Sequence, residues 1–567
     1  MKMRAALLGA AAVMGMAPAA FAERGTDGEV KLTFPQAVSI MNPYLSGGTK
    51  DVYASSLVLE PLAGLDPQGV LIPKLVTEIP TLDNGGISAD MTSITWKLLP
   101  DLKWSDGSAV TADDAVFTWQ YCTHPEGGCA QATKFEGVKS VEAVDPSTIK
   151  VTFTAPKANP YTAFVSSLSP VLQKAQFEAC LGAAAPTCTD ANNMPVGTGA
   201  FKVTGFTVND TVSMAANENY RDPAKPAFAT AVIKGGGDAE GSARAVMETG
   251  EFDYAWNTQI PPETQASMTA AGKGQFVVAF GTLVERLEMN TTDPDPALPE
   301  GERSTAKHPH PILSDIKVRT ALSKAIDRSI LVEDGYGEGG KPTCNVIPAP
   351  DAWASDNTGC IAQDMEGAKA LLDEAGWTDT DGDGIRDKDG KKLHILYQST
   401  VNPIRQDFQA LIKDWWTELG VEVELKAIDP GVFFGGDPGS PDTFQKFYAD
   451  VEMYANNSDS PDAEVYLGQY QCKNAPSPET QWQGENINRF CTPEYDALFA
   501  ELGGVTDVAK RQEIAKKLND MVTKDSMIVV PLVHRGTLSA HSNALGGVQI
   551  NAWDSEFWNV ADWFRVK

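Results

Sequence analysis

The sequence predicts an α/β protein with more than one domain, and three observations support this. The chain has 567 residues, more than one hydrophobic core ordinarily serves. Hydrophobic residues make up 42% of it and charged residues 21%, as in soluble globular proteins. Helical patterns run directly into strand patterns at 242–256 and again at 404–427, which is typical of α/β layering.

The first expected elements lie in the N-terminal third. A strand is expected at 29–34 and a second at 94–98, where apolar and polar residues alternate. A turn then leads to a helix that begins near Thr111, because Thr111 and Asp114 have the spacing of a capping box. This segment also carries three tryptophans that we expect to pack in a core: Trp96, Trp104 and Trp119.

The later helices are marked by their caps and stops. A helix is expected at 314–335, with Ser314 as its N-cap and Gly335 at its end. Another ends at Gly376, and the helix 404–419 ends at Gly420 before the alternating strand. The two glycines in 195–206 precede a strand, whereas a phosphate-binding loop should open a helix.

The N-terminus reads as a signal peptide over residues 1–22. Lys2 and Arg4 precede an apolar run, and Ala20-Phe21-Ala22 forms an A-x-A cleavage site. No cysteine stands at the cleavage point, so a lipid anchor is not expected, and no later apolar stretch is long enough to span a bilayer. We therefore expect an exported, soluble protein in the periplasm, without membrane insertion.

The net charge of the chain argues against some classes of binding partner. The net charge is −29, and removing the leader, which holds two cations and no acids, makes the mature chain more acidic still. Such a surface disfavours nucleic acid and anionic lipid as partners. It says little about a small ligand.

The cysteines indicate disulfide bonds. An even number in an exported chain predicts bridges, although eight cysteines allow 105 connectivities. Their clustering suggests four local pairs, and because no C-x-x-C pair occurs, neither a zinc site nor a redox motif is expected. The suggested pairs are Cys122–Cys129, Cys180–Cys188, Cys344–Cys360 and Cys472–Cys491.

A series of motifs, in this order, resembles the solute-binding proteins of ATP-binding-cassette importers, in family 5 with the oligopeptide and dipeptide binders. The motifs are ITWKLLPDLKWSDGSAVTADDAVFTW, PVGTGAFKV, NENYRDPAKP, TGEFDYAW, ILSDIKVRTALSKAIDRSIL, AKALLDEAGW, DGIRDKDGKKL and RFCTPEYDAL. Each is weak alone, and they span nearly the whole mature chain. The resemblance implies a two-lobed periplasmic-binding-protein-like fold of type II, with an extra subdomain in the first lobe.

The resemblance also implies a division of the chain and a mode of action. The first lobe would comprise 23–72, 196–285 and 531–567, its subdomain 73–195, and the second lobe 286–530. A double-crossover hinge would close the lobes over a small solute, a peptide or a similar polar molecule. The closed monomer, which needs no cofactor, would then dock on an inner-membrane permease powered by a separate ATPase.

The segment MYANNSDSPDAEVY offers the first site candidates, Asn456, Asn457 and Asp459. They follow a strand pattern, and open α/β sheets place ligands at strand ends. In peptide binders of the family an Asp here pairs with the α-amino group of the ligand; by register with Pro461 that position is Asn457, and Asp459 lies two residues on. An amide provides no counter-charge. The alternative is a solvated loop.

The dipeptide specificity known in this family cannot be transferred to this chain. Dipeptide binders of the family hold the ligand carboxylate with an Arg just before an Asn-Pro. Here Asn402-Pro403 is present, but residues 398–401 contain no Arg. Arg405 lies downstream, where we expect the surface of a helix.

Three aromatic residues are further ligand candidates. Trp482 lies between Cys472 and Cys491, and a disulfide-closed loop can hold a stacking ring at low entropic cost. Tyr44 and Trp256 lie where first-lobe strands are expected to end near the cleft. For each of them, packing in a core is the alternative.

The stretch DTDGDGIRDKDG has part of a calcium-loop spacing. Asp379, Asp381, Asp383 and Asp387 take positions 1, 3, 5 and 9, but Gly390 stands at position 12, where a bidentate Glu is required. An acidic turn explains the pattern as well, and the expectation is no bound metal.

The motifs also bear on two alternative functions. An exported hydrolase is disfavoured because there is no G-x-S-x-G or H-E-x-x-H motif, and none of the six histidines lies in a triad context. An oligosaccharide binder stays open, because sugars take amide hydrogen bonds and aromatic stacking. We therefore expect a binding protein and not an enzyme.

Overall fold

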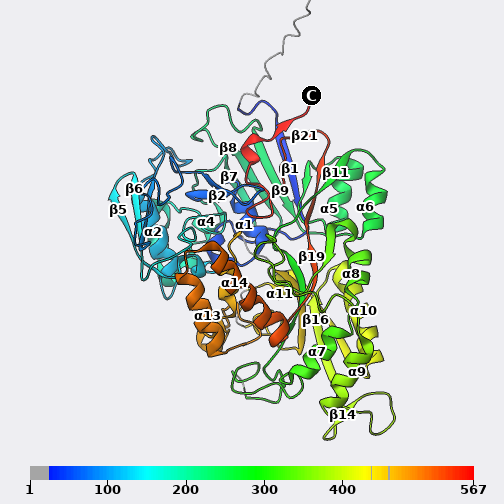
Figure 1. Ribbon diagram of the computed structural model, residues 1–567. Helices are drawn as coiled ribbons and strands as arrows, with labels where there is room; N and C mark the ends of the chain where they lie inside the picture. The colour runs from blue at the N-terminus through cyan, green and yellow to red at the C-terminus, as the bar shows by residue number, and fades with distance from the viewer. Residues whose placement is uncertain (1–23, 300, 436, 438, 457–459) are drawn as a thin grey trace, which may run out of the picture.

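The computed structural model describes residues 24–299, 301–435, 437, 439–456 and 460–567. Each of two lobes contains a large mixed sheet (Figure 1). The first-lobe sheet has the order β11-β20-β10-β1-β9-β8-β7. Its strands are β1 (Glu29–Phe34), β7 (Phe201–Thr207), β8 (Thr211–Ala216), β9 (Thr230–Gly235), β10 (Tyr254–Ala255), β11 (Gly274–Ala279) and β20 (Thr537–Ser542).

The second-lobe sheet has the order β13-β19-β12-β18-β16-β17. Its strands are β12 (Val284–Met289), β13 (Gly340–Pro342), β16 (His394–Thr400), β17 (Glu422–Ile428), β18 (Val451–Asn456) and β19 (Val529–Arg535). Helices α7 (Ile316–Lys324), α8 (Arg328–Gly335), α9 (Met365–Glu374) and α10 (Pro403–Glu418) lie on one side of it, and α13 (Pro493–Gly504) and α14 (Val508–Asp520) on the other (Figure 1).

A subdomain is built on the antiparallel sheet β4-β6-β5. It comprises β4 (Ser93–Lys97), β5 (Val138–Asp145), β6 (Thr148–Phe153) and α2 (Ala112–Thr123). The predicted capping box is present at the start of α2, where the Thr111 backbone N–H donates to the Asp114 carboxylate at 2.9 Å. Trp96 and Trp104 are buried in the core of this subdomain, and the half-buried Trp119 packs against it. These predictions are confirmed.

The remaining elements are short. They include α1 (Thr49–Ser55), β2 (Ala63–Leu65), β3 (Leu71–Pro73), α3 (Lys174–Phe177), α4 (Thr189–Asn193), α5 (Ala239–Arg244), α6 (Pro262–Thr269), β14 (Asp387–Lys388), β15 (Lys391–Lys392), α11 (Pro430–Phe433), α12 (Glu464–Leu467), β21 (Leu545–Gly546) and β22 (Phe564–Arg565). No helix among the described residues is both long and apolar enough to cross a bilayer.

Two connections join the lobes, from β11 to β12 and from β19 to β20. The predicted boundaries after 285 and 530 fall inside β12 and β19, yet both strands pair wholly within the second sheet. The chain therefore changes sheet at 280–283 and at Gly536. The difference arises because apolar strand patterns do not reveal which of two sheets a strand joins.

One predicted helix is two. The segment 314–335 forms α7 and α8, with a break at 325–327. Asp315, and not Ser314, caps α7 by accepting from the Lys317 N–H at 2.9 Å. Asp327 caps α8 by accepting from the N–H groups of Ser329 and Ile330. The break follows from the strong preference of Asp for N-cap positions.

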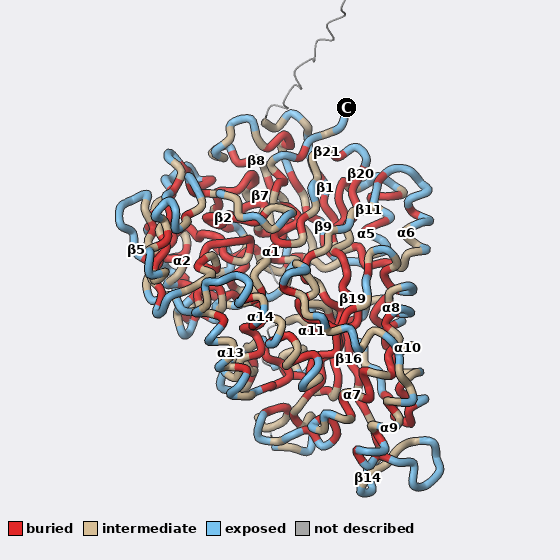
Figure 2. Tube along the Cα trace, viewed as in Figure 1, coloured by how far each residue is buried: buried red, intermediate tan, exposed pale blue. Residues whose placement is uncertain are grey.

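The lobes have separate cores. Central strands such as β12 and β19 are fully buried, whereas the edge strands β7, β11 and β17 are only partly buried and many loops are exposed (Figure 2). All four predicted disulfides are formed, Cys122–Cys129, Cys180–Cys188, Cys344–Cys360 and Cys472–Cys491. Each closes a local loop, so they brace loops within a lobe or its subdomain and leave the lobes free of covalent cross-links to one another.

Candidate functional site

The interface between the lobes includes the end of β18. Asn456 is the last residue of this strand and pairs with Val284, the first residue of β12, where the chain arrives from the first lobe. The Asn456 amide donates to Gln469 Oε1 at 3.3 Å. The two neighbouring candidates, Asn457 and Asp459, lie outside the described residues.

The segment after β18 touches the first lobe. Gly69, between β2 and β3, has φ of +75°, and a Cβ placed on it would lie 2.7 Å from Pro461 Cγ. The same Cβ would lie 3.6 Å from Trp553 Cδ2, in the C-terminal part of the first lobe. The second lobe therefore reaches the first lobe just past the residues predicted to bind solute.

An aromatic cluster lies in the core of the first lobe, at the end of β10. Trp256 directly follows β10, is 4% exposed, and has its ring centroid 5.0 Å from that of Phe34 and 5.9 Å from that of Tyr53. The Tyr53 hydroxyl reaches the Asp554 carbonyl oxygen at 3.4 Å, next to Trp553. Trp256 is thus linked through Tyr53 to the segment 553–554, which lies beside Gly69.

A buried acid supports this cluster. Glu556 accepts hydrogen bonds from the hydroxyls of Tyr254 and, at 2.6 Å, Ser539, and the Trp256 side chain lies within reach of it. Burial raises the pKa of Glu556 to about 7, against the lowering effect of these hydrogen bonds. Sequence reasoning missed this residue; the available signal was an acid between the aromatic residues of 553–558.

Tyr44 does not join this group. It is fully buried in the core of the subdomain, with its ring against Tyr121 and Phe135. Its hydroxyl donates to the Pro170 carbonyl oxygen at 2.6 Å. Burial raises the pKa of this phenol. In this structure Tyr44 therefore packs in a core, which was the alternative to a role in ligand binding.

Trp482 lies in the second lobe, in the loop closed by Cys472–Cys491. Its ring is T-shaped against Tyr448 at 5.8 Å, with Lys446 Nζ 5.7 Å and Arg489 Cζ 5.9 Å from its centroid. It is 8% exposed. The ring is held by cations and another aromatic residue, and none of its described contacts joins it to Asn456 or Trp256.

The lobes are in contact at other points as well. The Asn402 amide donates to Gln259 Oε1 of the first lobe at 3.3 Å. On the subdomain side, Lys473 forms an ion pair with Glu136. The Ala158 N–H also donates to the Gly503 carbonyl oxygen at 3.4 Å. The structure is therefore a closed arrangement of the two lobes.

The expectation that Arg405 lies on the helix surface is wrong. Arg405 is 5% exposed, and its Nε donates to Glu285 Oε1 at 2.7 Å. Burial alone would favour the neutral acid, but Arg405 and Arg535 hold the pKa of Glu285 below its usual value. The acid that draws Arg405 inward stands on a strand far away in the sequence, and this partner has no local signature.

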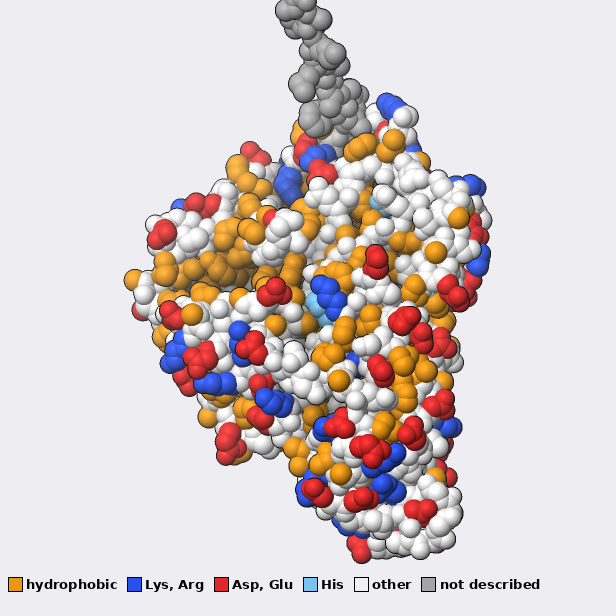
Figure 3. All heavy atoms as spheres, turned by 45° about the vertical axis from the view of Figure 1, so that its right-hand side comes forward, with side chains coloured by type: hydrophobic (Ala, Val, Ile, Leu, Met, Phe, Trp, Pro, Cys, Tyr) orange, Lys and Arg blue, Asp and Glu red, His pale blue; other side chains and the backbone are white. Residues whose placement is uncertain are grey.

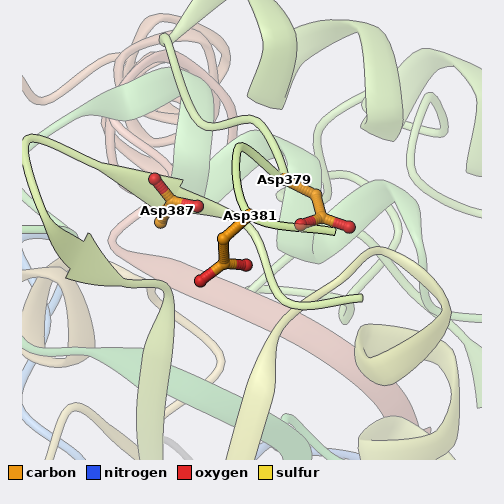
Figure 4. A group of neighbouring side chains, drawn as sticks. All are labelled: Asp379, Asp381 and Asp387. Carbon is orange, nitrogen blue, oxygen red and sulfur yellow. The ribbon is translucent and has the colours of Figure 1, made fainter. Parts of the chain in front are cut away.

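The acidic hairpin lies at the tip of the second lobe, away from the first lobe (Figure 1). Asp379 and Asp381 on the loop and Asp387 on β14 hold carboxylate oxygens within 4.8 Å of one another (Figure 4). Asp383 is outside this trio and binds Lys392 Nζ at 2.8 Å, as Asp381 does at 2.7 Å. Lys392 already supplies positive charge there, as expected of an acidic turn.

The surface charge is mixed. Acidic and basic side chains are interspersed over the second lobe on the face shown in Figure 3. Ion pairs at the surface of this lobe include Lys324 with Asp364 at 2.6 Å.

Comparison with known proteins agrees with this architecture. Residues 71–477 match the profile of bacterial extracellular solute-binding proteins, family 5 Middle. Oligopeptide-binding protein AppA of Bacillus subtilis is 25% identical over 366 residues, covering 63% of this chain and 61% of AppA. Glutathione-binding protein GsiB of Salmonella typhimurium is 23% identical over 514 residues, covering 90% of each chain.

Solved structures share the fold. AppA in complex with a nonapeptide has a TM-score of 0.78 at 18% identity, covering 96% of this chain and 100% of that one. NikZ of Campylobacter jejuni in complex with Ni(L-His) has a TM-score of 0.78 at 21% identity, covering 95% and 99%. Since the family profile spans well over half of the chain, the protein belongs to the bacterial extracellular solute-binding proteins of family 5, the solute-binding components of ATP-binding-cassette importers.

Proposed function

We propose that this protein captures a peptide or a similar-sized polar solute between its lobes and delivers it unchanged to an inner-membrane permease. The observation that carries the proposal is the meeting of the lobes just past the end of β18, where Pro461 packs on Gly69. A solute held there would contact strand ends of both sheets, which is where open α/β sheets bind ligands. The relatives named for oligopeptide and glutathione binding support a peptide-like solute.

The solute is longer than a dipeptide or is uncharged at its anchored end. Burying an amine or a carboxylate without a partner costs several kcal/mol. The position that pairs with the amine in peptide binders is Asn457 here, and no Arg precedes Asn402. The nearest arginine, Arg405, is already bound to Glu285 and to Thr400 Oγ1, at 2.9 Å, and so is not available to a ligand carboxylate.

Trp256 supplies one wall of this site and Asn456, at the end of β18, the opposite one. Asn457 and Asp459, which follow in the sequence, are the proposed anchors of the solute. Trp482 lies on the second-lobe side. Tyr44 supports the site indirectly, by packing in the core of the subdomain. The lobes comprise 24–72, 196–279 and 537–567 on one side and 284–535 on the other, with 73–195 as the subdomain. The mature protein is a monomer in the periplasm, exported by the leader at 1–22.

Mass spectrometry of solute that co-purifies with the protein is the direct test. Calorimetry on solute-stripped protein should follow, with peptides of increasing length, with free or blocked ends, and with oligosaccharides as a comparison series. We expect binding of longer or end-blocked peptides, and every solute recovered intact. Tight binding of oligosaccharides alone, or conversion of the solute, would contradict the proposal.

A further inference from the structure

One face of the second-lobe sheet carries charged residues in a fully buried layer. Arg286 and Glu288 on β12 share this face with Glu452 on β18, and all three are no more than 1% exposed. Glu288 stands directly opposite Glu452 in the antiparallel pair β12–β18. Gln398 on β16 is in register with Glu452 on its other side. Glu452 is therefore flanked by a carboxyl group and an amide.

The two facing carboxyl groups do not have equal partners. Side chains directly opposite across an antiparallel pair lie about 5 Å apart, and two carboxylates at that separation cannot both ionise in a buried site. Burial raises the pKa of both acids, but Glu288 has a cation that opposes the rise, because Arg286 Nε lies 2.5 Å from Glu288 Oε1. Of the pair, Glu452 is therefore the group that keeps a proton.

The cations near Glu452 are engaged elsewhere. The Arg489 guanidinium donates to the backbone carbonyl oxygens of Gln445, at 2.7 Å, and of Lys446, at 3.2 Å. Lys426 pairs with Asp442 at 2.6 Å. Within the part of the chain that the structure describes, Glu452 forms no ion pair with either cation.

The hydrogen bonds between Glu452 and Gln398 are incomplete without a proton. The Gln398 amide N–H donates to Glu452 Oε1. Glu452 Oε2 and Gln398 Oε1 are both buried and have no partner among the described residues. A proton on Glu452 Oε2, donated to Gln398 Oε1, would satisfy both atoms at once and close a ring of two hydrogen bonds. An ionised Glu452 would leave two buried acceptors unpaired, at a cost typical of unsatisfied polar groups.

We propose that Glu452 is protonated in the folded protein and forms a hydrogen-bonded acid–amide ring with Gln398, a proton-held clamp between β16 and β18. The groups that face Glu452 agree with this state. Burial raises the pKa of Glu452 well above its usual value and Glu288 adds to the rise, whereas Gln398, Arg489 and Lys426 lower it. Since Asn456 ends β18 and Asn402 follows β16, the clamp fixes the two strands that reach the lobe interface.

The clamp makes stability depend on pH with a defined sign. The folded protein holds a proton that the unfolded chain releases above a pKa of about 4.3. Its contribution is fully present below that pH and is lost as the pH rises through the raised pKa of the folded state. Over this interval the equilibrium constant for unfolding should rise tenfold per pH unit from this group alone.

The test compares wild type with Glu452→Gln in denaturant unfolding between pH 5 and pH 9. Two amides can form the same ring without a proton, so the ratio of unfolding constants, wild type over variant, should rise up to tenfold per pH unit. The matched control is Glu285→Gln, an equally buried acid on the same strand as Glu288 but ionised beside Arg405. Its ratio should not rise with pH. A ratio for Glu452→Gln that stays flat or falls overturns the proposal.

Infrared spectroscopy gives a second readout that does not depend on stability. The carbonyl band of a buried, protonated carboxylic acid should be present at pH 8 in wild type and in Glu285→Gln, and one such band should be missing in Glu452→Gln. Gln398→Met keeps the acid but removes its acceptor, so the band should persist at a shifted frequency. The absence of an acid band in wild type overturns the proposal. If Glu452→Gln does not fold, Gln398→Met takes its place in the test, and an acid band at the wild-type frequency in folded Gln398→Met likewise overturns the proposal.

Discussion

Pro461 of the second lobe packs against Gly69 of the first lobe without room for a methyl group between them. A Cβ on Gly69 would lie 2.7 Å from Pro461 Cγ. Any side chain at position 69 therefore has to displace Pro461 or hold the lobes further apart, so the closed arrangement is most favourable with a glycine there.

Gly69→Ala should weaken solute binding by about 1–3 kcal/mol, the usual cost of overpacking a tight contact. Gly28→Ala is the control, because Gly28 also has φ of +75° but nothing within 4 Å of its Cβ position. Both variants carry the backbone cost of a left-handed alanine, about 1–2 kcal/mol in stability. Calorimetry and small-angle scattering should show the loss of affinity and of closure for Gly69→Ala alone. Equal affinities in the two variants would contradict this account.

Arg405→Met should destabilise the protein by about 3–5 kcal/mol, because it leaves Glu285 buried with less compensation. In wild type the lowered pKa of Glu285 contributes stability above about pH 4.3 that is lost as the pH falls. In the variant Glu285 should take up a proton, so that stability instead declines as the pH rises.

Denaturant unfolding between pH 4 and pH 8 measures this reversal. Lys392→Met removes two surface ion pairs at the acidic hairpin, with Asp381 and Asp383, and should change stability by less than about 1 kcal/mol. A loss for Arg405→Met no larger than that of Lys392→Met would show that the buried pair matters little.

Glu556→Gln should remove the part of the pH dependence of stability near neutrality that comes from this group, and leave the part that comes from Glu452. The pKa of Glu556 is about 7 in the folded protein, above the value of about 4.3 for an unfolded chain. Its contribution is present below that lower value and is lost as the pH rises through 7, a change on the order of 3 kcal/mol. Thermal unfolding should show wild type losing stability across this range and Glu556→Gln gaining relative to it. Glu218→Gln, at an exposed ion pair, should keep the wild-type profile.

Asn457→Ala should weaken solute binding by about 1–3 kcal/mol through a lost buried hydrogen bond. Binding that resists Asn457→Ala but is lost in Asp459→Ala would place the anchor two residues further on. Calorimetry with the co-purified solute distinguishes the two outcomes.

Trp482→Ala should cost at least as much if the ring is a central anchor for the solute. Trp482→Phe keeps an aromatic ring on Tyr448 and should retain most of the affinity. Unchanged binding in Trp482→Ala, with lowered stability, would assign Trp482 to packing alone.

Local features of the fold were predictable from sequence because their causes are local. The capping box at Thr111 depends on a spacing of three residues, and the disulfides join neighbouring cysteines. Features made by distant partners were not predictable. Arg405 is drawn inward by Glu285, which is 120 residues away.

The candidate site also has a part that the sequence predicts and a part that depends on distant partners. The family resemblance pointed to the end of β18, which the structure places at the lobe interface, but not to the buried acids Glu452 of the second lobe and Glu556 of the first. Glu452 stands at an inward position of the apolar strand β18, and Glu556 is a buried acid in the aromatic loop 553–558, so in both places an acid is a signal in itself. What each acid does depends on its partners, which the strand register reveals for Glu452 and only the packing of the loop against β10 and β20 reveals for Glu556.

The order of the strands also constrains how the chain can mature. β19 lies between β13 and β12 in one sheet, and β20 lies between β11 and β10 in the other. Neither sheet can therefore be completed before the C-terminal segment is available. Pairings of such large sequence separation form slowly. During export, neither lobe can complete its sheet until the end of the chain has crossed the membrane, so a chain truncated before 529 would present split sheets with open edges to proteases and chaperones.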